Sequence, residues 1–273
     1  MIQPMINIMS FNLRTASASD GSNGWEERKQ MVIERIRSFS PDLIGVQECR
    51  NDAQAEYMQS SLPDYNFIGF ERGGEGETAI EMAPIFVKKA AFSIQDAGCF
   101  WLSETPEQPG SISWGSAFPR TVTWARLAAQ QDRGRELYFF NTHFDYANLR
   151  AQVESARLLS RRLAALEHHP PVILCGDFNI GKDTAPYQAL LAGDAAGHGR
   201  LQDCFRQANP APWGDEGTFH DFGRLEPPAA LDWMLASGHF QPVEAGIDRY
   251  QEGNRYPSDH YPLTCRGGLH TGE

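Results

Sequence analysis

Residues 172–179 read Val-Ile-Leu-Cys-Gly-Asp-Phe-Asn, an apolar run that ends in a carboxylate and a carboxamide. The run from Val172 to Cys175 predicts a strand that is buried on both faces. Asp177 and Asn179 are two residues apart, so on extended backbone they point the same way. A carboxylate is costly to bury without a partner or a cation. A lone Asp-x-Asn is equally typical of a turn, so the other strand ends must decide whether this pair is functional.

Polar residues of the same kind follow other apolar, strand-like runs or lie inside them. They are Asn12, Glu48, His143, Asp145, Asp177, Asn179, Asp232, Asp259 and His260. Since strand ends in α/β architectures gather in one crevice, we expect these side chains to converge. Converging carboxylates repel one another unless a cation lies among them. A sulfur-free, oxygen-rich set favours Mg²⁺ or Mn²⁺ over zinc.

The elements that would position these residues can be read from hydrophobic periodicity. Helices are predicted over about 25–39, 53–62, 147–167 and 187–191, and strands over 6–11, 42–48, 65–70, 84–88, 121–125, 136–143, 172–175 and 230–235. The final third is expected to be rich in loops. Strands outnumber helices and alternate with them only in places, which favours two packed sheets with helices on their outer faces. No Pro/Ser-rich linker divides the chain, so residues 1–273 are expected to form one domain.

Composition limits the class of protein. Apolar residues make up 41% of the 273, and the formal net charge is −11. This charge argues against a partner such as long duplex nucleic acid, which needs clustered Lys and Arg. The five cysteines form no C-x-x-C pair, so neither a disulfide framework nor a zinc cluster is expected. Without a signal peptide or membrane-spanning run, the sequence predicts a soluble cytoplasmic protein, which we expect to be a monomer.

Six short motifs resemble those of the endonuclease/exonuclease/phosphatase superfamily, and they occur in family order from about residue 5 to 264. They are Ser-Phe-Asn12, Gln-Glu48, Asn-Thr-His143, Gly-Asp177-Phe-Asn179, Leu-Asp232 and Ser-Asp259-His260. The superfamily includes DNase I-like nucleases, abasic-site endonucleases, deadenylases, sphingomyelinases and inositol polyphosphate 5-phosphatases. Residues 100–106 and 119–120 also resemble a bacterial branch whose substrates are largely unassigned. The resemblance implies a DNase I-like four-layer α/β/β/α sandwich, in which helices flank two packed mixed sheets.

The resemblance also implies how the metal and the attacking water are held. Glu48 would be the principal ligand of Mg²⁺ or Mn²⁺, and Asn12 and Asp259 would complete or support its coordination. Asp177, helped by Asn179, would orient or deprotonate the water.

The two histidines are assigned by the resemblance to the phosphoryl oxygens of the substrate. His143 and His260 would contact these oxygens, and Asp232 would pair with His260. Glu81 stands where some nuclease members carry an acid that pairs with the other histidine, here His143.

Three further residues are candidate substrate contacts. Arg120 is of the residue type preferred for phosphate recognition, and Asp145 shares the strand face of His143. Trp114 lies in a loop-like segment and could stack on a base or sugar. Each also has an ordinary interpretation, as a surface, turn or core residue.

These observations favour a divalent-metal phosphodiesterase or phosphatase that hydrolyses a small or short phosphorylated substrate by in-line attack of a metal-site water. Two alternatives stay open. One is a 3′–5′ exonuclease on single-stranded nucleic acid, which needs only a short groove with stacking aromatic residues. The other is a non-catalytic protein that binds a partner through the inherited cleft.

Overall fold

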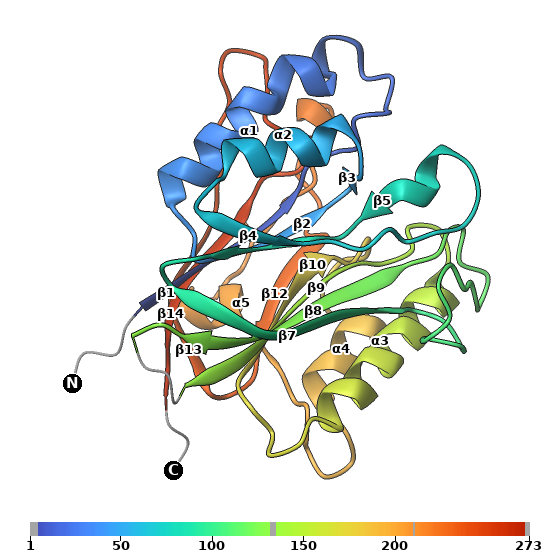
Figure 1. The fold of residues 1–273 in the computed structure, drawn as a ribbon, viewed down its shortest axis with the longest axis vertical. Helices are drawn as coiled ribbons and strands as arrows, with labels where there is room; N and C mark the ends of the chain where they lie inside the picture. The colour runs from blue at the N-terminus through green and yellow to red at the C-terminus, as the bar shows by residue number, and fades with distance from the viewer. Residues whose placement is uncertain (1–4, 132–134, 210, 271–273) are drawn as a thin grey trace.

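Two six-stranded sheets pack face to face between helices (Figure 1). The structure, a computed structural model, describes residues 5–131, 135–209 and 211–270. The first sheet has the order β13 (Phe240–Ile247), β14 (Leu263–Leu269), β1 (Met5–Asn12), β2 (Leu43–Gln47), β6 (Ile85–Lys88) and β4 (Tyr65–Ile68). The second has the order β11 (Gln202–Asp203), β12 (Asp232–Ala236), β10 (Val172–Asp177), β9 (Glu136–His143), β8 (Thr121–Ala129) and β7 (Phe92–Trp101). A short ribbon pairs β3 (Cys49–Arg50) with β5 (Glu81–Met82).

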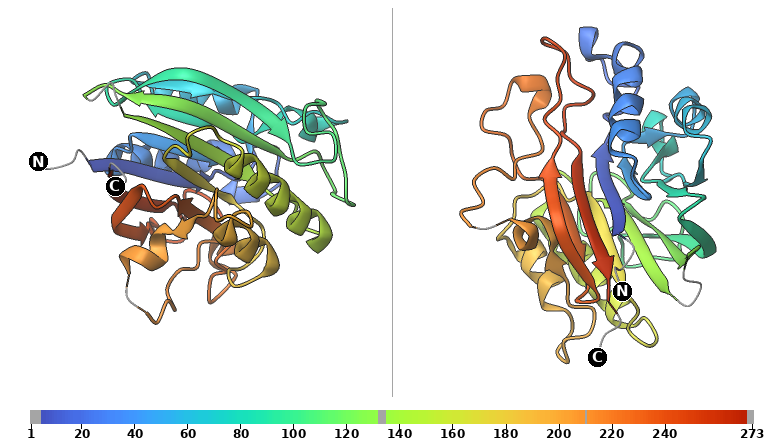
Figure 2. Two further views of the ribbon diagram at one scale, coloured as in Figure 1. Left: turned by 90° about the horizontal axis from the view of Figure 1, so that it is seen from below. Right: turned by 90° about the vertical axis from the view of Figure 1, so that its left-hand side faces the viewer.

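Helices cover the outer face of each sheet, which confirms the predicted four-layer sandwich. Helices α1 (Trp25–Phe39) and α2 (Ala53–Ser61) pack on the first sheet. Helices α3 (Leu149–Ala164) and α4 (Ala185–Ala192) pack on the second, and the two views of Figure 2 show the same layers from other sides. The short helix α5 (Cys204–Ala208) follows β11 and packs with β12 and β13.

The alternation of side chains along buried strands explains this layering. On β1, Ile8 faces the interior between the sheets, whereas Met9 packs against the layer of α1. On β10, Ile173 faces the same interior, whereas Leu174 packs toward α3 and α4. Both strands are apolar on both faces because each is covered on both sides.

Strand direction brings the predicted site residues to one edge of the sandwich. β1 runs parallel to β2, so that Asn12 pairs with Gln47, the residue before Glu48. In the second sheet β9 runs parallel to β10, and Asp177 pairs with His143 on one side and with Asp232 of antiparallel β12 on the other. Polar ends of five strands therefore meet at this edge.

The helix predictions are confirmed to within a few residues. α1 has the predicted bounds, whereas α3 begins at Leu149 because the Asn148 side chain accepts hydrogen bonds from the backbone N–H groups of Arg150 and Ala151. The prediction of a loop-rich final third is wrong in part, since β13 and β14 extend the first sheet next to β1. Among the described residues, no helix combines the length and the apolar character required to cross a bilayer.

Candidate active site

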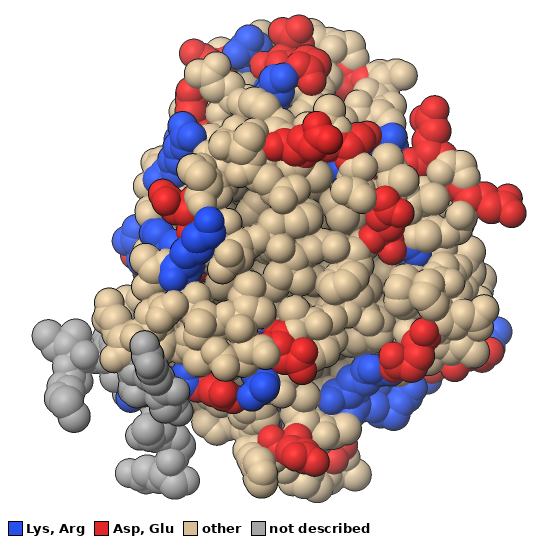
Figure 3. Space-filling view, viewed as in Figure 1, with Lys and Arg blue, Asp and Glu red and all other residues tan. Residues whose placement is uncertain are grey.

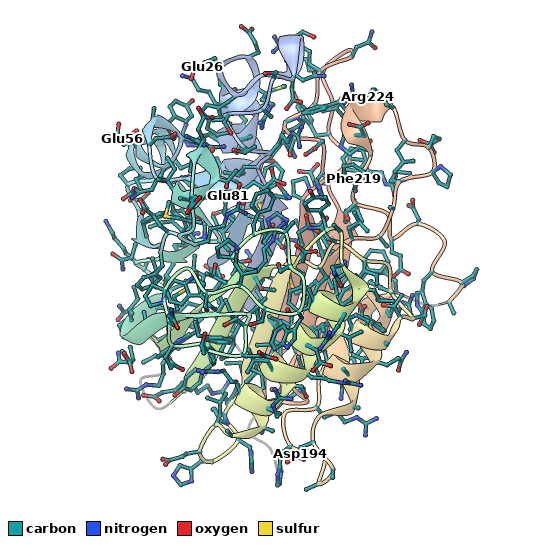
Figure 4. All side chains as sticks on the ribbon, turned by 90° about the vertical axis from the view of Figure 1, so that its right-hand side faces the viewer. Glu26, Glu56, Glu81, Asp194, Phe219 and Arg224 are labelled. Atoms are coloured by element: carbon teal, nitrogen blue, oxygen red, sulfur yellow. The ribbon has the colours of Figure 1, made fainter. Side chains whose placement is uncertain are left out.

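A cleft opens at the edge where the strand ends meet, and it offers about 360 Å³ to water-sized molecules. Its walls come from both sheets and from the loops that follow them. The lining residues are Arg14, Glu48, Arg72, Thr78, Glu81, Phe118, Arg120, His143, Tyr146, Asp177, Asn179, Phe219, Leu231, Asp259 and His260. In Figure 4 Glu81 and Phe219 are labelled on opposite sides of the dense group of side chains at the centre.

Asp177 lies at the centre of the polar residues, and its side chain is almost completely buried. Its Oδ2 atom accepts a hydrogen bond from Asn12 Nδ2 at 2.9 Å and lies 3.6 Å from His143 Nε2 and 3.7 Å from His260 Nε2. Its Oδ1 atom accepts from the backbone N–H of Asn179. Burial, together with the charge of Asp232, raises the pKa of Asp177 to about 7. The carboxyl can therefore exchange a proton near neutral pH.

Glu48 lies directly after β2 and faces the cleft. Its Oε1 atom accepts from Asn12 Nδ2 at 3.1 Å, and its Oε2 atom accepts from the backbone N–H of Thr15 at 2.9 Å. The Oδ1 atom of Asn12 accepts the backbone N–H of Arg14, so this carboxamide presents its donors to Glu48 and Asp177. Of the two expected roles of Asn12, this geometry suits support of the carboxylates.

Asp259 is buried beside the same cleft. Its Oδ1 atom accepts from Ser258 Oγ, and its Oδ2 atom lies 3.6 Å from Arg14 Nε. Burial raises the pKa of Asp259, and the nearby charge of Glu48 adds to this effect. A cation bound beside Asp259 would favour its ionised form.

His260 is held by Asp232 in the arrangement that the family resemblance implies. The Nδ1 atom of the imidazole lies 2.7 Å from Asp232 Oδ2. Burial alone would lower the pKa of His260, but the charges of Asp232 and Asp177 outweigh it and raise the pKa to about 10. His260 is therefore a cation at neutral pH, and its Nε2–H can donate to an anion.

His143 differs from His260 although both lie in the cleft. Asn179 Nδ2 is 2.9 Å from His143 Nε2 and also donates to the carbonyl of Phe144, so the imidazole accepts through Nε2 and carries its proton on Nδ1. Burial, then the charges of Arg120 and Arg72, holds the pKa of His143 well below its usual value. Nδ1 has no hydrogen-bond partner among the described residues.

The expected pairing of Glu81 with His143 is wrong. Glu81 Oε1 accepts from Arg72 Nη1 at 2.5 Å instead. Arg72 comes from the loop after β4 and is itself almost fully buried. Its guanidinium pairs with the Glu81 carboxylate, which the resemblance had assigned to His143. Arg120 precedes β8, lines the cleft as expected, and is 5% exposed.

Two expected substrate contacts lie outside the cleft lining. Asp145 is 1% exposed and uses both carboxylate oxygens within the protein, accepting from Ser116 Oγ and from the backbone N–H groups of Ala117, Ala147 and Asn148. It joins two loops that present cleft residues. Trp114 Nε1 donates to Glu104, and its ring packs against the hydrophobic cluster under α3. We therefore correct both interpretations to structural roles.

Arg28 supports the site and was not anticipated, because its spacing on α1 resembles an ordinary charged face. It is 1% exposed. Its guanidinium donates to the backbone carbonyls of Leu13, Arg14, Asn23 and Pro257. It thereby ties the loop after Asn12 to the segment before Asp259.

The donor set fits a hard cation. One group of potential ligand atoms within 4.8 Å of one another belongs to Glu48, His143 and Asp177, and a second belongs to Asp177, Asp232 and His260. The second group is less suitable, because Asp232 already pairs with a protonated imidazole. Oxygen donors predominate around Glu48, which favours Mg²⁺ or Mn²⁺ at that end of the cleft.

Comparison with known proteins gives one family profile and two solved structures that match most of the chain, and one relative that matches part of it. The profile of the Endonuclease/Exonuclease/phosphatase family matches residues 9–260. The structure of an endonuclease/exonuclease/phosphatase from Bacteroides vulgatus is 28% identical, with a TM-score of 0.87 and coverage of 98% of this chain and 100% of that one. The mannosyl-6-phosphatase Bt3783 of Bacteroides thetaiotaomicron is 30% identical, with a TM-score of 0.82 and coverage of 95% and 98%. Protein L388 of Acanthamoeba polyphaga mimivirus is 27% identical over 174 residues, which span 57% of this chain and 59% of L388.

Proposed function

The chain belongs to the Endonuclease/Exonuclease/phosphatase family, whose members are hydrolases that act on phosphoesters, and from this membership we propose that it is a divalent-metal-dependent phosphoesterase for a small or short phosphorylated substrate. The observation that carries the proposal is the convergence of Glu48, Asp177, Asp259 and His260 in one cleft. These residues come from the first, middle and last parts of the chain, in or next to strands of both sheets, and each would have a task in the hydrolysis of a phosphate ester.

Asp177 is the candidate general base. Its Oδ2 atom faces His143, His260 and Asn12, and a pKa near 7 allows it to take a proton from an attacking water at neutral pH. Such assistance is worth about 10²–10⁴-fold in rate. Asn179 would help by fixing the Asp177 carboxylate through its backbone N–H.

His260 would bind the phosphoryl oxygens. The protonated His260, oriented by Asp232, donates from Nε2 and neutralises charge that develops in the transition state. His143 is neutral and its Nε2 accepts from Asn179, so in this tautomer that atom has no proton to donate to a phosphoryl oxygen, and the imidazole instead holds the Asn179 side chain.

Glu48 would be the principal ligand of Mg²⁺ or Mn²⁺, with Asp259 as a second carboxylate and Asn12 holding Glu48 in place. When bound, the cation neutralises phosphoryl charge and lowers the pKa of its bound water. Burial first, with Asp232 near Asp177 and Glu48 near Asp259, raises the pKa of these two carboxyl groups, and a cation beside them would favour their ionised form.

A small substrate is favoured by the dimensions and charge of the protein. The cleft is of the size that encloses a small molecule. On the face drawn in Figure 3, basic groups are separated by acidic and uncharged surface and form no continuous basic band. The 30% identical relative from B. thetaiotaomicron is a mannosyl-6-phosphatase, which adds sugar monophosphates to the candidate substrates.

Initial rates on three substrates test the proposal. The purified protein is assayed with p-nitrophenyl phosphate, bis-p-nitrophenyl phosphate and a labelled single-stranded oligonucleotide, in Mg²⁺ and in Mn²⁺. Hydrolysis of the small esters with EDTA-sensitive kinetics is the expected result. Preference for the oligonucleotide would favour the exonuclease alternative. Failure to hydrolyse all three in both cations would contradict catalysis and favour the binding protein.

Two variants separate the roles of the acids. Glu48→Gln should weaken cation binding measured by calorimetry, because a neutral amide is a poorer ligand for a hard cation. Asp177→Asn should retain cation binding but lose at least about a hundredfold in kcat, because the amide cannot accept a proton. Retention of most of the rate by Asp177→Asn would contradict the water-activating role.

A further inference from the structure

Arg120 is a buried cation on the cleft wall. The residue is 5% exposed, and its Nε atom has no hydrogen-bond partner among the residues that the structure describes. Among residues 5–131, 135–209 and 211–270 its guanidinium has no ion-pair or hydrogen-bond partner. Its Cζ atom lies 5.9 Å from the centroid of the Phe118 ring, and its charge acts at longer range on Glu81 and His143. Buried charges in proteins are normally paired, since removal from water costs several kcal/mol. The Arg120 guanidinium can therefore bind an anion that is not part of the chain.

Arg72 adds a second positive charge to the same wall. Its Nη1 atom pairs with Glu81 and its Nε atom donates to the carbonyl of Thr78. Its Cζ atom lies 4.7 Å from the centroid of the Phe118 ring. Glu81 pairs with Arg72 alone and feels the charge of Arg120 at longer range, so the wall formed by Arg72, Glu81 and Arg120 has a formal net charge of +1.

This basic wall is distinct from the acidic end of the cleft. A small recess behind it is lined by Arg72, Glu81, Arg120 and His143, together with Met82, Ala83, Pro119 and Thr121. The acids Glu48, Asp177 and Asp259 line the main cleft but not this recess. Arg120 belongs to both, so an anion in the main cleft can reach its guanidinium.

We propose that Arg120, supported by Arg72, binds a second anionic group of the substrate, a phosphate or a carboxylate that is not hydrolysed. The inference rests on the proposed function and narrows its substrate to compact molecules with two anionic groups. The hydrolysed phosphate lies at the Glu48 and His260 end, and the second anion lies at the Arg120 end. Phe118, which lies against both arginines, and Tyr146 also line the cleft with ring centroids 6.4 Å apart, and they provide an aromatic surface for a sugar or base.

Three sugar phosphates that differ in their second charge test the proposal. Glucose 6-phosphate carries one anionic group, 6-phosphogluconate adds a carboxylate, and glucose 1,6-bisphosphate adds a phosphate. We expect kcat/KM to be about ten- to a hundredfold higher for whichever doubly anionic probe carries the matching group, the range of one charge-assisted hydrogen-bonded pair. The better of these two probes identifies the anion as carboxylate or phosphate.

Arg120→Met should abolish this preference through KM, so that the three probes have similar kcat/KM values in the variant. Arg120→Lys should keep part of the preference, because lysine retains the positive charge but lacks the paired N–H donors of the planar guanidinium. Arg126→Met is the matched control, since Arg126 is half-exposed on β8 and pairs with Glu136. An equal loss of kcat on all three probes in Arg120→Met would place Arg120 on the hydrolysed phosphate and overturn the proposal.

A binding measurement separates this inference from the proposed function. Sulfate is titrated by calorimetry into the metal-free protein in EDTA. Wild-type protein should bind sulfate, and Arg120→Met should bind it at least about tenfold more weakly. If none of the sugar phosphates is hydrolysed, this titration still decides the subsite. Equal sulfate affinity in the two proteins, or no binding to the wild type, would overturn it.

Discussion

The Nδ1 atom of His260 lies 2.7 Å from Oδ2 of Asp232, and both side chains are almost completely buried. The two residues are 28 positions apart, one at the start of β12 and the other before β14. Their pairing keeps a positive imidazole beside Asp177, in a cleft that otherwise gathers carboxylates. The pair therefore balances charge within the site and supplies a donor to the substrate.

We predict that Asp232→Asn lowers the pKa of His260 from about 10 by about 1–3 units, since an adjacent opposite charge is removed. A histidine with a raised pKa stabilises the fold below its unfolded pKa, near 6.5, and this contribution is lost as the pH rises through about 10. Asp232→Asn should lose this contribution to stability at a lower pH than the wild-type protein does. NMR titration of the imidazole measures the shift. An unchanged pKa would contradict the charge balance described above.

The same variant should lower kcat increasingly as the pH rises above the lowered pKa of His260, about 7–9, where the imidazole becomes neutral, and by less at pH 6. His260→Ala should cost at least about a hundredfold at all pH values. Asp248→Asn is a suitable control, since this half-buried carboxylate pairs with Arg35. A uniform loss across pH in Asp232→Asn would instead indicate misplacement of the imidazole.

We predict that binding of Mg²⁺ or Mn²⁺ releases protons near pH 6.5. Burial and Asp232 raise the pKa of Asp177 to about 7, so much of this carboxyl is protonated there, and a cation beside it favours the ionised form. Affinity should therefore rise between pH 6 and 8. Calorimetry in two buffers of different ionisation enthalpy counts the protons released. Asp177→Asn should release fewer protons, and an equal number in both proteins would assign them to another group.

The acids at strand ends could be predicted because each follows a strongly apolar strand, and parallel strands bring their carboxyl ends together. Glu81, Asp145 and Trp114 could not be placed, because their partners are set by loops whose conformation has no periodic signal. Arg72 pairs with Glu81, and backbone N–H groups of two loops donate hydrogen bonds to Asp145. A short motif identifies a residue. The groups packed around that residue then determine whether its side chain is free to bind a metal or a substrate.

Strand β13 was not predicted for a related reason. Its burial alternates only over its first residues, Pro242 interrupts its register with β14, and Gly246 weakens the pattern further. A strand at the edge of a sheet needs little apolar character on its exposed face. By contrast, β9 and β10 lie inside the second sheet, and their continuous apolar runs made them evident.

We predict that Arg28→Met lowers the free energy of unfolding by about 3 kcal/mol or more, because four backbone carbonyls lose a buried, charged donor. Cation affinity should fall as well, since the loop after Asn12 and the segment before Asp259 are no longer tied together. Urea denaturation and calorimetry measure the two effects. Arg35→Met, on the same helix, should change stability by no more than about 1 kcal/mol. Loss of stability with unchanged cation affinity would limit Arg28 to the fold.

The close approach of the two sheets behind the site gives a last prediction. A Cβ atom added to Gly45 on β2 would lie 2.3 Å from Cys175 Sγ and 2.7 Å from Asn141 Oδ1. Asn141 Nδ2 donates to the carbonyls of Val46 and Pro84, so it ties the second sheet to the first and has little room to move. Gly45→Ala should therefore destabilise the protein by about 1–3 kcal/mol. Thermal and urea unfolding measure this change.

Gly246→Ala on β13 is the matched control for Gly45→Ala, because its added Cβ would meet only Thr264 Oγ1 at an ordinary 3.7 Å. Adding Cys175→Ala to Gly45→Ala removes the nearer of the two clashing atoms and should restore part of the stability. Activity should fall with stability in Gly45→Ala and recover with it in the double variant. Glu48 and His143 are held by strands from the two sheets that meet at this contact. If Gly45→Ala is as stable as Gly246→Ala, the sheets can separate at this point without cost, and the spacing of Glu48 from His143 must be set by the loops instead.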